Sequence, residues 1–159
     1  MRNERELIIE CFPSILSKTS YQFADLAPGD DESDPSEAGL QSIVEFRCGK
    51  LSGAIGVQVS ELFALQLVAN MIGADPDGVI DPVVMRDSTG ELVNIFAGQL
   101  LPVIFGKSEL FTLLAPVVTP LQSDKWSENR SQYTTVAFQV DDEFPVFVMY
   151  RSGGNRHAS

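Results

Sequence analysis

The sequence predicts an α/β (α+β) fold, in which two pseudo-symmetric helix-strand-hairpin halves form one largely antiparallel sheet with long helices packed on it. Three observations predict this fold. Apolar residues recur at helical spacing in several segments, β-branched and aromatic runs flank short turns, and one residue pattern occurs twice. With 159 residues, of which 44% are apolar, the chain is long enough for one sizeable core. We therefore expect a single domain over residues 1–152.

The elements of the first half follow from its residue patterns. Residues 4–17 have helical spacing, and Pro13 is expected to kink or break that helix. Residues 21–26 are suited to a short strand. The patterns of residues 42–48 and 51–59 predict a hairpin around a Gly-Lys turn. The first half is thus expected to run helix, strand, hairpin.

The second half is expected to repeat that order after a connecting helix. Ser60 is a suitable N-cap for the connecting helix, and Asp81 with Pro82 supplies an N-cap and an N1 proline for a long helix. The expected elements are a helix over residues 61–71, a helix over 82–105, a strand over 111–119 interrupted by Pro116, and a hairpin of strands 133–140 and 144–150.

Two segments have compositions typical of irregular structure. Residues 28–39 are acidic and rich in Pro, Gly and Ser, so we expect an exposed flexible loop within the domain. A carboxylate-rich metal loop is the less favoured alternative, because the segment lacks the ligand spacing of an EF-hand. Residues 153–159 are expected to form a disordered tail.

A short pattern recurs in the two halves. Residues 13–19 match residues 102–108, and after a one-residue gap residues 23–28 match residues 111–116. The hairpins correspond as well, since Val44 and Phe46 align with Val136 and Phe138. Coincidence among common residues is the alternative, but the order of the expected elements agrees in both halves, which favours a duplicated unit.

Charge and residue usage exclude several classes of function. The net charge of −11 would repel phosphate backbones and anionic lipids, so we expect neither a nucleic-acid nor a membrane partner. No secretory signal and no run of about 20 apolar residues is found, so we expect a cytoplasmic protein. The only histidine is His157, which leaves no candidate within the domain for a Ser-His-Asp triad or a Cys/His metal site.

The long predicted helix carries one narrow stripe of residues that are neither large nor apolar. Asp87, Glu91, Asn94 and Gly98 fall at i, i+4, i+7 and i+11, between continuous apolar flanks. Asn94, Gly98 and Pro102 are poor helix formers, which is unusual for a helix of this composition. An ordinary solvent-exposed stripe is the simplest interpretation. However, such a stripe more often contains Lys, Glu, Gln or Ala, so we also consider a slot for another protein.

The pattern from Asp87 through Gly90, Glu91, Asn94 and Ile95 to Gly98 resembles the signature of the CheC/CheX/FliY family of chemotaxis phosphatases, and CheX-like members in particular. The resemblance extends over about residues 4–150, through the Gly-Ala-Ile-Gly run at 53–56, the Asn-Met-Ile-Gly run at 70–73 and the Ala-Pro-Val-Val run at 115–118. Family members have two pseudo-symmetric halves. Here Arg2 and Arg5 stand where the first half would carry the Glu/Asn pair, which resembles CheX, with one motif, more than CheC, with two.

The resemblance implies that the protein hydrolyses the aspartyl phosphate of a CheY-like response regulator. It implies that Glu91 and Asn94 are catalytic residues on a helix inserted into the receiver active site, with Asp87 and Gly98 at the contact with the partner. The expected cofactor is Mg²⁺ on the receiver, with no metal or cofactor of the chain's own, and homodimers are common in the family. The alternative is a non-catalytic module for receiver binding or dimerisation in two-component signalling.

Overall fold

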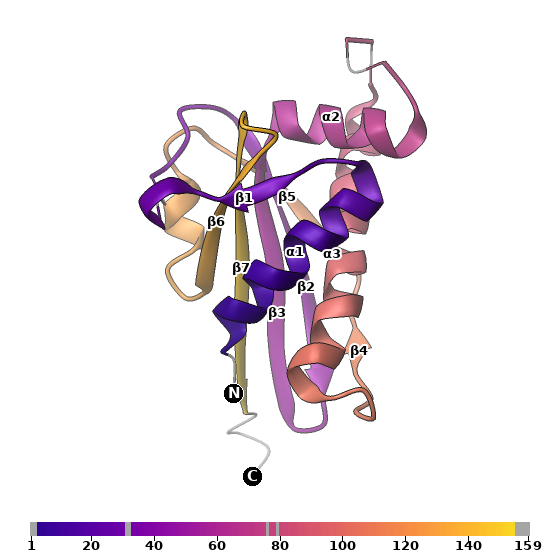
Figure 1. Cartoon of the computed structure of the whole chain (residues 1–159), viewed down its shortest axis with the longest axis vertical. Coiled ribbons are helices and arrows are strands. Elements are labelled where there is room, and N and C mark those ends of the chain that lie inside the picture. Colours follow the sequence, from indigo (N-terminus) through magenta and orange to yellow (C-terminus); the bar gives the residue numbers. More distant parts are fainter. Residues whose placement is uncertain (1–2, 31–32, 76, 79, 155–159) are drawn as a thin grey trace.

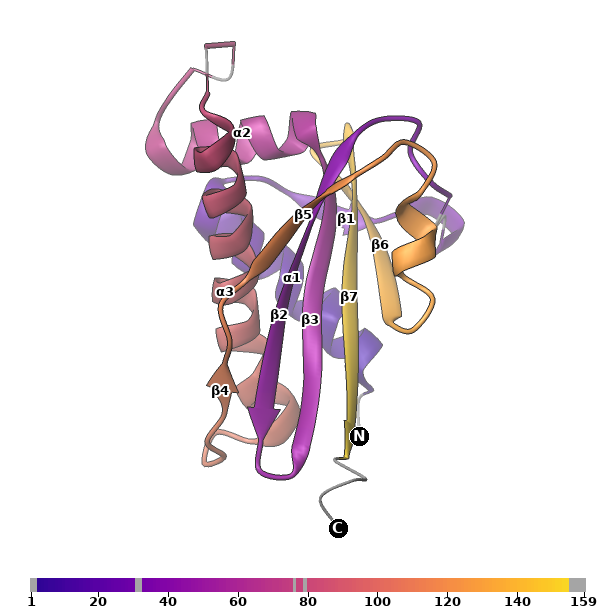
Figure 2. The same ribbon diagram turned by 180° about the vertical axis from the view of Figure 1, so that it is seen from behind.

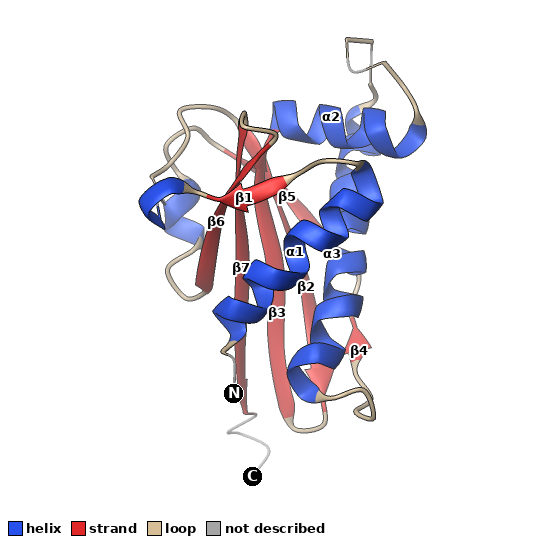
Figure 3. Ribbon diagram, viewed as in Figure 1, coloured by secondary structure: helices blue, strands red, loops and turns tan. Residues whose placement is uncertain are grey.

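One antiparallel sheet forms a layer of the molecule, and the helices cover one of its faces (Figures 1 and 3). The computed structural model describes residues 3–30, 33–75, 77–78 and 80–154. The helices are α1 (Glu4–Ser20), α2 (Glu61–Ile72) and α3 (Pro82–Phe105), with short 3₁₀ turns η1 (Pro28–Asp30) and η2 (Trp126–Asn129). The strands are β1 (Ala24–Leu26), β2 (Gly39–Cys48), β3 (Leu51–Ser60), β4 (Thr112–Leu113), β5 (Val117–Leu121), β6 (Thr134–Val140) and β7 (Phe144–Gly154). The predicted fold class is confirmed.

The strand order confirms the predicted two-fold arrangement of the halves. The sheet runs β1-β6-β7-β3-β2-β4, and β5 also pairs with β2. Each half therefore contributes a hairpin, β2–β3 or β6–β7, and the two hairpins join at the centre through β3 and β7. The short strand of each half pairs with the hairpin of the other half: β1 with β6, and β4 with β2. The halves are thus interlocked at both edges of the sheet.

The sheet also corrects one detail of the predicted repeat. Leu26 lies opposite Phe138, and Leu113 lies opposite Phe46. If Phe46 and Phe138 are equivalent, the counterpart of Leu26 is Leu113, whereas the residue match pairs Leu26 with Leu114. The sequence match between the two halves is therefore shifted by one residue in this segment. A short match of common residues contains no information on which face of the sheet each side chain occupies.

Both long helices contain a proline and begin at well-formed caps. In α1, Asn3 and Glu6 form a capping box, and the helix passes through Pro13 to Ser20 without the predicted break. In α3, the Asp81 carboxylate accepts a 2.8 Å hydrogen bond from the Val83 N–H. The helix therefore begins and ends where the sequence predicts.

The main core lies between the helices and one face of the sheet. Phe12 of α1 contacts Phe96 of α3, with ring centroids 5.3 Å apart, and Phe138 of β6 at 5.1 Å. All three rings are buried. By length and composition α3 could cross a membrane, but here it is a core helix, with Leu92, Val93 and seven other residues buried.

The opposite face of the sheet is partly covered by η2, which the sequence did not predict (Figure 2). Trp126 of η2 is fully buried against Phe147, and the guanidinium of Arg130 lies over the Phe147 ring, 4.0 Å from its centroid. Gln58 Nε2 donates to the Trp126 carbonyl at 2.9 Å, and Arg130 Nη1 donates to Gln58 Oε1 at 3.0 Å. These contacts fix η2 to the sheet.

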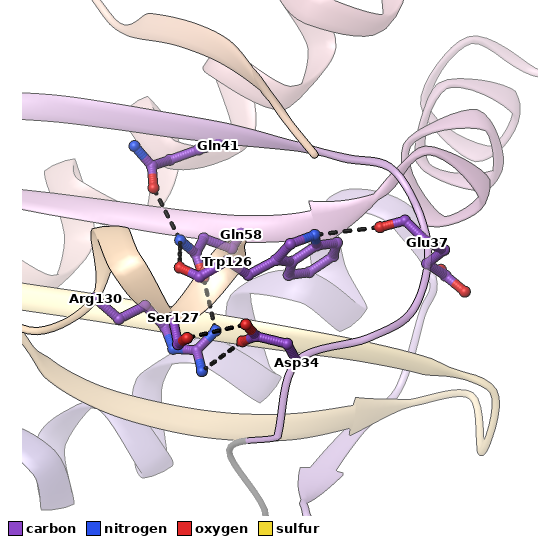
Figure 4. A network of polar contacts seen from close by, with 7 residues as sticks. All are labelled: Asp34, Glu37, Gln41, Gln58, Trp126, Ser127 and Arg130. Atoms are coloured by element: carbon purple, nitrogen blue, oxygen red, sulfur yellow. Dashed lines mark hydrogen bonds and ion pairs between the residues drawn. The ribbon is translucent and has the colours of Figure 1, made fainter. Parts of the chain in front are cut away.

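The same polar network holds one end of the acidic segment over residues 28–39 (Figure 4). Arg130 Nη2 forms an ion pair with Asp34 Oδ1 at 3.2 Å, and Ser127 Oγ donates to Asp34 Oδ2 at 2.9 Å. Trp126 Nε1 donates to the Glu37 carbonyl. Residues 31–32 lie outside the described residues, but Asp34, expected in an exposed loop, has a side chain only 15% exposed. At the other end of the chain, β7 extends to Gly154, two residues into the predicted tail, and residues 155–159 are outside the described residues.

Candidate functional site

Helix α3 presents the predicted stripe on its one face that is not covered by sheet or helix. Leu92, Val93 and Phe96 have no exposed surface, because they face the core. Glu91, which precedes them, is exposed, and Asn94 is half-buried. A helix that buries its flanking residues so completely holds its remaining face in a fixed orientation. The backbone at Glu91 and Asn94 is therefore held in place by the packing of the neighbouring residues.

A groove of about 440 Å³ runs between α3 and the β4–β5 segment. Figure 2 shows this segment beside the helix, at the edge of the sheet. The groove is lined by Arg86, Asp87, Gly90, Glu91, Asn94, Pro116 and Val118. The structure thus brings Asp87, Glu91 and Asn94 together in one concave site. Gly98 lies on the same helix, one turn beyond the groove lining.

Two glycines of α3, Gly90 and Gly98, differ in the space around them. A Cβ atom added at Gly90 would lie 3.3 Å from Pro116 Cβ and 3.6 Å from Val118 Cγ2, so Gly90 permits close packing of the helix on the sheet edge. A Cβ added at Gly98 would meet nothing within 4 Å outside the helix's own backbone. Packing within the chain therefore accounts for Gly90 and leaves Gly98 unexplained.

The polar side chains of the groove are available to a partner. Among the described residues, no hydrogen bond or ion pair engages the side chain of Glu91 or Asn94. By contrast, Thr89 on the adjoining face donates to the Met85 carbonyl at 2.8 Å. An amide can donate and accept at once, and a carboxylate can receive a cation, so the site can orient a small polar reactant and pair with a basic group.

No metal site is found in the part of the chain that the structure describes, where no three His, Cys, Asp or Glu side chains gather closely enough to hold an ion. The groove does contain one basic residue that the sequence reasoning missed, Arg86. Arg86 directly precedes Asp87 and extends the stripe toward the start of α3. Helical spacing predicts that Arg86 lies near Asp87, but a single surface arginine does not by itself indicate a functional site.

The first half has no equivalent site among the described residues. Arg5, which stands where the second half has Asn94, donates from Nη1 to the Thr135 carbonyl at 3.1 Å. This contact attaches α1 to β6, so the residue serves the packing of the two halves. Arg2, the counterpart of Glu91, lies outside the described residues.

Comparisons by sequence and by structure give different results. No protein-family profile matches the chain, and no curated protein sequence matches it. The structure matches the chemotaxis protein CheX from Vibrio vulnificus with a TM-score of 0.71 at 15% identity, covering 96% of this chain and 100% of that chain. CheX in a CheX–CheY–BeF3–Mg²⁺ complex from Borrelia burgdorferi matches with a TM-score of 0.63 at 16% identity, covering 94% and 97%. FliY from Thermotoga maritima matches with a TM-score of 0.59 at 15% identity, covering 96% and 91%. The chain therefore has the fold of the CheX-like chemotaxis proteins.

Proposed function

We propose that this protein is a CheX-like phosphatase, which hydrolyses the aspartyl phosphate of a CheY-like response regulator. The observation that carries the proposal is the Glu91/Asn94 pair, free of partners within the described chain, on the exposed face of an otherwise buried helix. The fold supports it, since one structure of this fold is a complex of CheX with CheY. The proposal places the protein in the cytoplasm, where its receiver partner would be found.

The chemistry requires little from the phosphatase beyond positioning. An acyl phosphate is already activated, so the main task is to hold a water in line with phosphorus. The water oxygen forms a bond to phosphorus and the bond from phosphorus to the aspartyl oxygen breaks. The phosphate leaves with the protons of the water, and the aspartate is restored as a carboxylate. The Asn94 amide accepts one hydrogen bond from this water and donates none of its own protons to the products.

Glu91 has a docking role in this proposal. Its carboxylate is exposed one turn before Asn94, where it can pair with the active-site lysine of the receiver. That pairing sets the register in which the helix enters the receiver. Mg²⁺ bound by the receiver neutralises charge on the phosphoryl group, so the phosphatase needs no metal of its own. Asp87 lies at the edge of the contact.

The first test is Asn94→Ala, which removes the amide without disturbing the core. We expect at least a hundredfold loss of stimulated receiver dephosphorylation, because the attacking water is no longer oriented. Release of phosphate from a receiver phosphorylated by a small acyl phosphate measures the rate. Gln99→Ala, on the exposed surface of the same helix but outside the groove, is the matched control. A variant at position 94 that works as fast as the control contradicts the mechanism.

The second test separates docking from catalysis. Glu91→Ala should weaken binding of the beryllium-fluoride-activated receiver by about tenfold, because one charge-assisted contact is lost. Titration calorimetry measures the affinity, and Glu109→Ala, an exposed carboxylate outside the groove, is the control. An unchanged dissociation constant would show that Glu91 does not dock the partner.

The same experiments test the alternative of a non-catalytic module. Such a module would bind the receiver without accelerating phosphate release. The expectation of a homodimer is tested separately, by light scattering of the purified protein.

A further inference from the structure

A second row of residues runs along α3 beside the acidic residues of the stripe. Arg86, Gly90 and Asn94 lie at i, i+4 and i+8, so they share one face of the helix. A Cβ added at Gly90 would lie 3.3 Å from Pro116, which shows that this face is turned toward the edge of the sheet. Glu91 follows Gly90 directly and is therefore turned about 100° away from it. Arg86 and Glu91 thus lie on opposite sides of the groove, and Asn94 lies between them around the helix.

Arg86 is a cation without a partner in the described part of the chain. It is exposed, and of the residues that line the groove it is the one with a positive charge, in a protein of net charge −11. No ion pair or hydrogen bond of its side chain is found among the described residues, in contrast to Arg5 and Arg130. Asp87 adjoins it in sequence, but residues i and i+1 project from a helix in different directions. The guanidinium is therefore available to a carboxylate of another molecule.

The position of Arg86 excludes it from the chemical step itself. Eight residues separate it from Asn94, which is about 12 Å along the helix axis. Side chains on a helix also tilt toward its N-terminus, so the guanidinium is directed away from Asn94. A partner group that contacts Arg86 must therefore lie outside the reacting atoms.

We propose that Arg86 is a positioning residue, which pairs with a carboxylate of the receiver beside its phosphorylation site. This inference rests on the proposed function. A receiver holds Mg²⁺ with carboxylates, so its surface around the site is expected to be acidic. The negative field of this chain opposes such a surface, and Arg86 is the local charge in the groove that attracts it.

The two charges of opposite sign fix the orientation of the receiver. A single contact between Glu91 and a receiver lysine leaves rotation about that contact free. Arg86 adds a second contact about 7.5 Å away along the helix, on the other side of the groove. Together they direct the phosphoryl group to Asn94. A receiver with a neutral or basic group opposite Arg86 is disfavoured, so the residue also contributes to the choice of partner.

Arg86→Glu tests the proposal by reversing the charge. The dissociation constant for the beryllium-fluoride-activated receiver should rise by about tenfold or more in low salt, and the effect should shrink as salt screens the charges. In phosphate release the loss should fall on KM, with kcat nearly unchanged. Lys107→Glu, at an exposed lysine outside the groove, makes the same change in net charge and is the matched control. Its affinity should change by less than about twofold.

Rescue by the receiver gives an independent measurement. Each receiver carboxylate that borders the phosphorylation site, apart from the Mg²⁺ ligands, is replaced by Lys and titrated against Arg86→Glu. One replacement should restore binding to this variant while weakening binding to the wild type. Arg86→Ala removes the charge without adding another and is the second variant if Arg86→Glu does not fold.

The outcomes separate this inference from the proposed function. Equal effects of Arg86→Glu and Lys107→Glu, a loss in kcat without a change in KM, or no rescue by any receiver variant would each overturn the role of Arg86. The proposed function would stand in all three cases, provided that the wild type accelerates phosphate release. Absence of any complex between the wild-type protein and activated receivers overturns both.

Discussion

Individual residues of α3 show how a core helix can also present an exposed polar face. Leu92, Val93 and Phe96 are fully buried, whereas Glu91 is exposed and Asn94 is half-buried on the remaining face of the helix. The polar pair was predictable from sequence because polar residues at helical spacing stand out in an apolar helix. The position of Pro116 in the groove was not predictable from periodicity, because it depends on which part of the sheet edge packs against the helix.

At Gly90 we predict that a larger side chain costs stability. Gly90→Val would place atoms against Pro116 and Val118, where an added Cβ already has only 3.3 Å of space. Overpacking of this kind costs about 1–3 kcal/mol, so the midpoint of chemical denaturation should fall. Gly98→Ala is the control and should gain about 1 kcal/mol from helix propensity. Equal behaviour of the two variants would show that the helix does not depend on close packing at Gly90.

Among the elements, the long helices were the most predictable and η2 the least. The helix start at Asp81 and Pro82 follows from local capping chemistry, which a sequence displays directly. Trp126 in η2 is buried by Phe147 and by strands far away in the chain, and no local pattern encodes such contacts. The attachment of the acidic segment was hidden for the same reason, since Asp34 and Arg130 are distant in sequence.

The Asp34 contact makes a prediction about pH. Burial on its own raises the pKa of Asp34, but hydrogen bonds from Ser127 and the charge of Arg130 outweigh it, so the pKa lies below the usual 3.8. A lowered pKa in the folded state stabilises the protein above pH 3.8, and this contribution is lost as the pH falls through the folded pKa.

Asp34→Asn should therefore lower the free energy of unfolding at pH 7 by roughly 1–2 kcal/mol, which allows for partial solvent exposure. The difference from the wild type should shrink below pH 3.8, where the native carboxylate also becomes protonated. Urea denaturation across pH measures both effects, with Asp142→Asn in the exposed β6–β7 turn as the control. A difference that is constant with pH would argue that the Asp34 charge does not contribute.

For the whole molecule, the sequence predicted two related halves but not how they are joined. The repeat indicated equivalent elements, whereas the exchange of β1 and β4 between the hairpins depends on sheet topology. On its outer edge, the outer strand of each hairpin is paired only with short strands from the other half.

We predict that residues 1–78 and residues 79–159, produced as separate fragments, do not fold alone. Each fragment would expose one side of the central β3–β7 pairing and lack the short strand that covers its hairpin. Circular dichroism and amide exchange should show unfolded fragments that recover protected strands when mixed. A stable, protected single fragment would contradict the interlocked arrangement.

The exchanged edge strands also explain why the two halves need each other. The short strand of each unit pairs with the hairpin of the other unit: β1 adds to β6, and β4 adds to β2. The architecture is therefore that of two similar units joined in one chain, each completing the sheet of the other. The two units differ in their helices: α3 presents the Glu91/Asn94 pair, while Arg5 of α1 donates to the Thr135 carbonyl of β6.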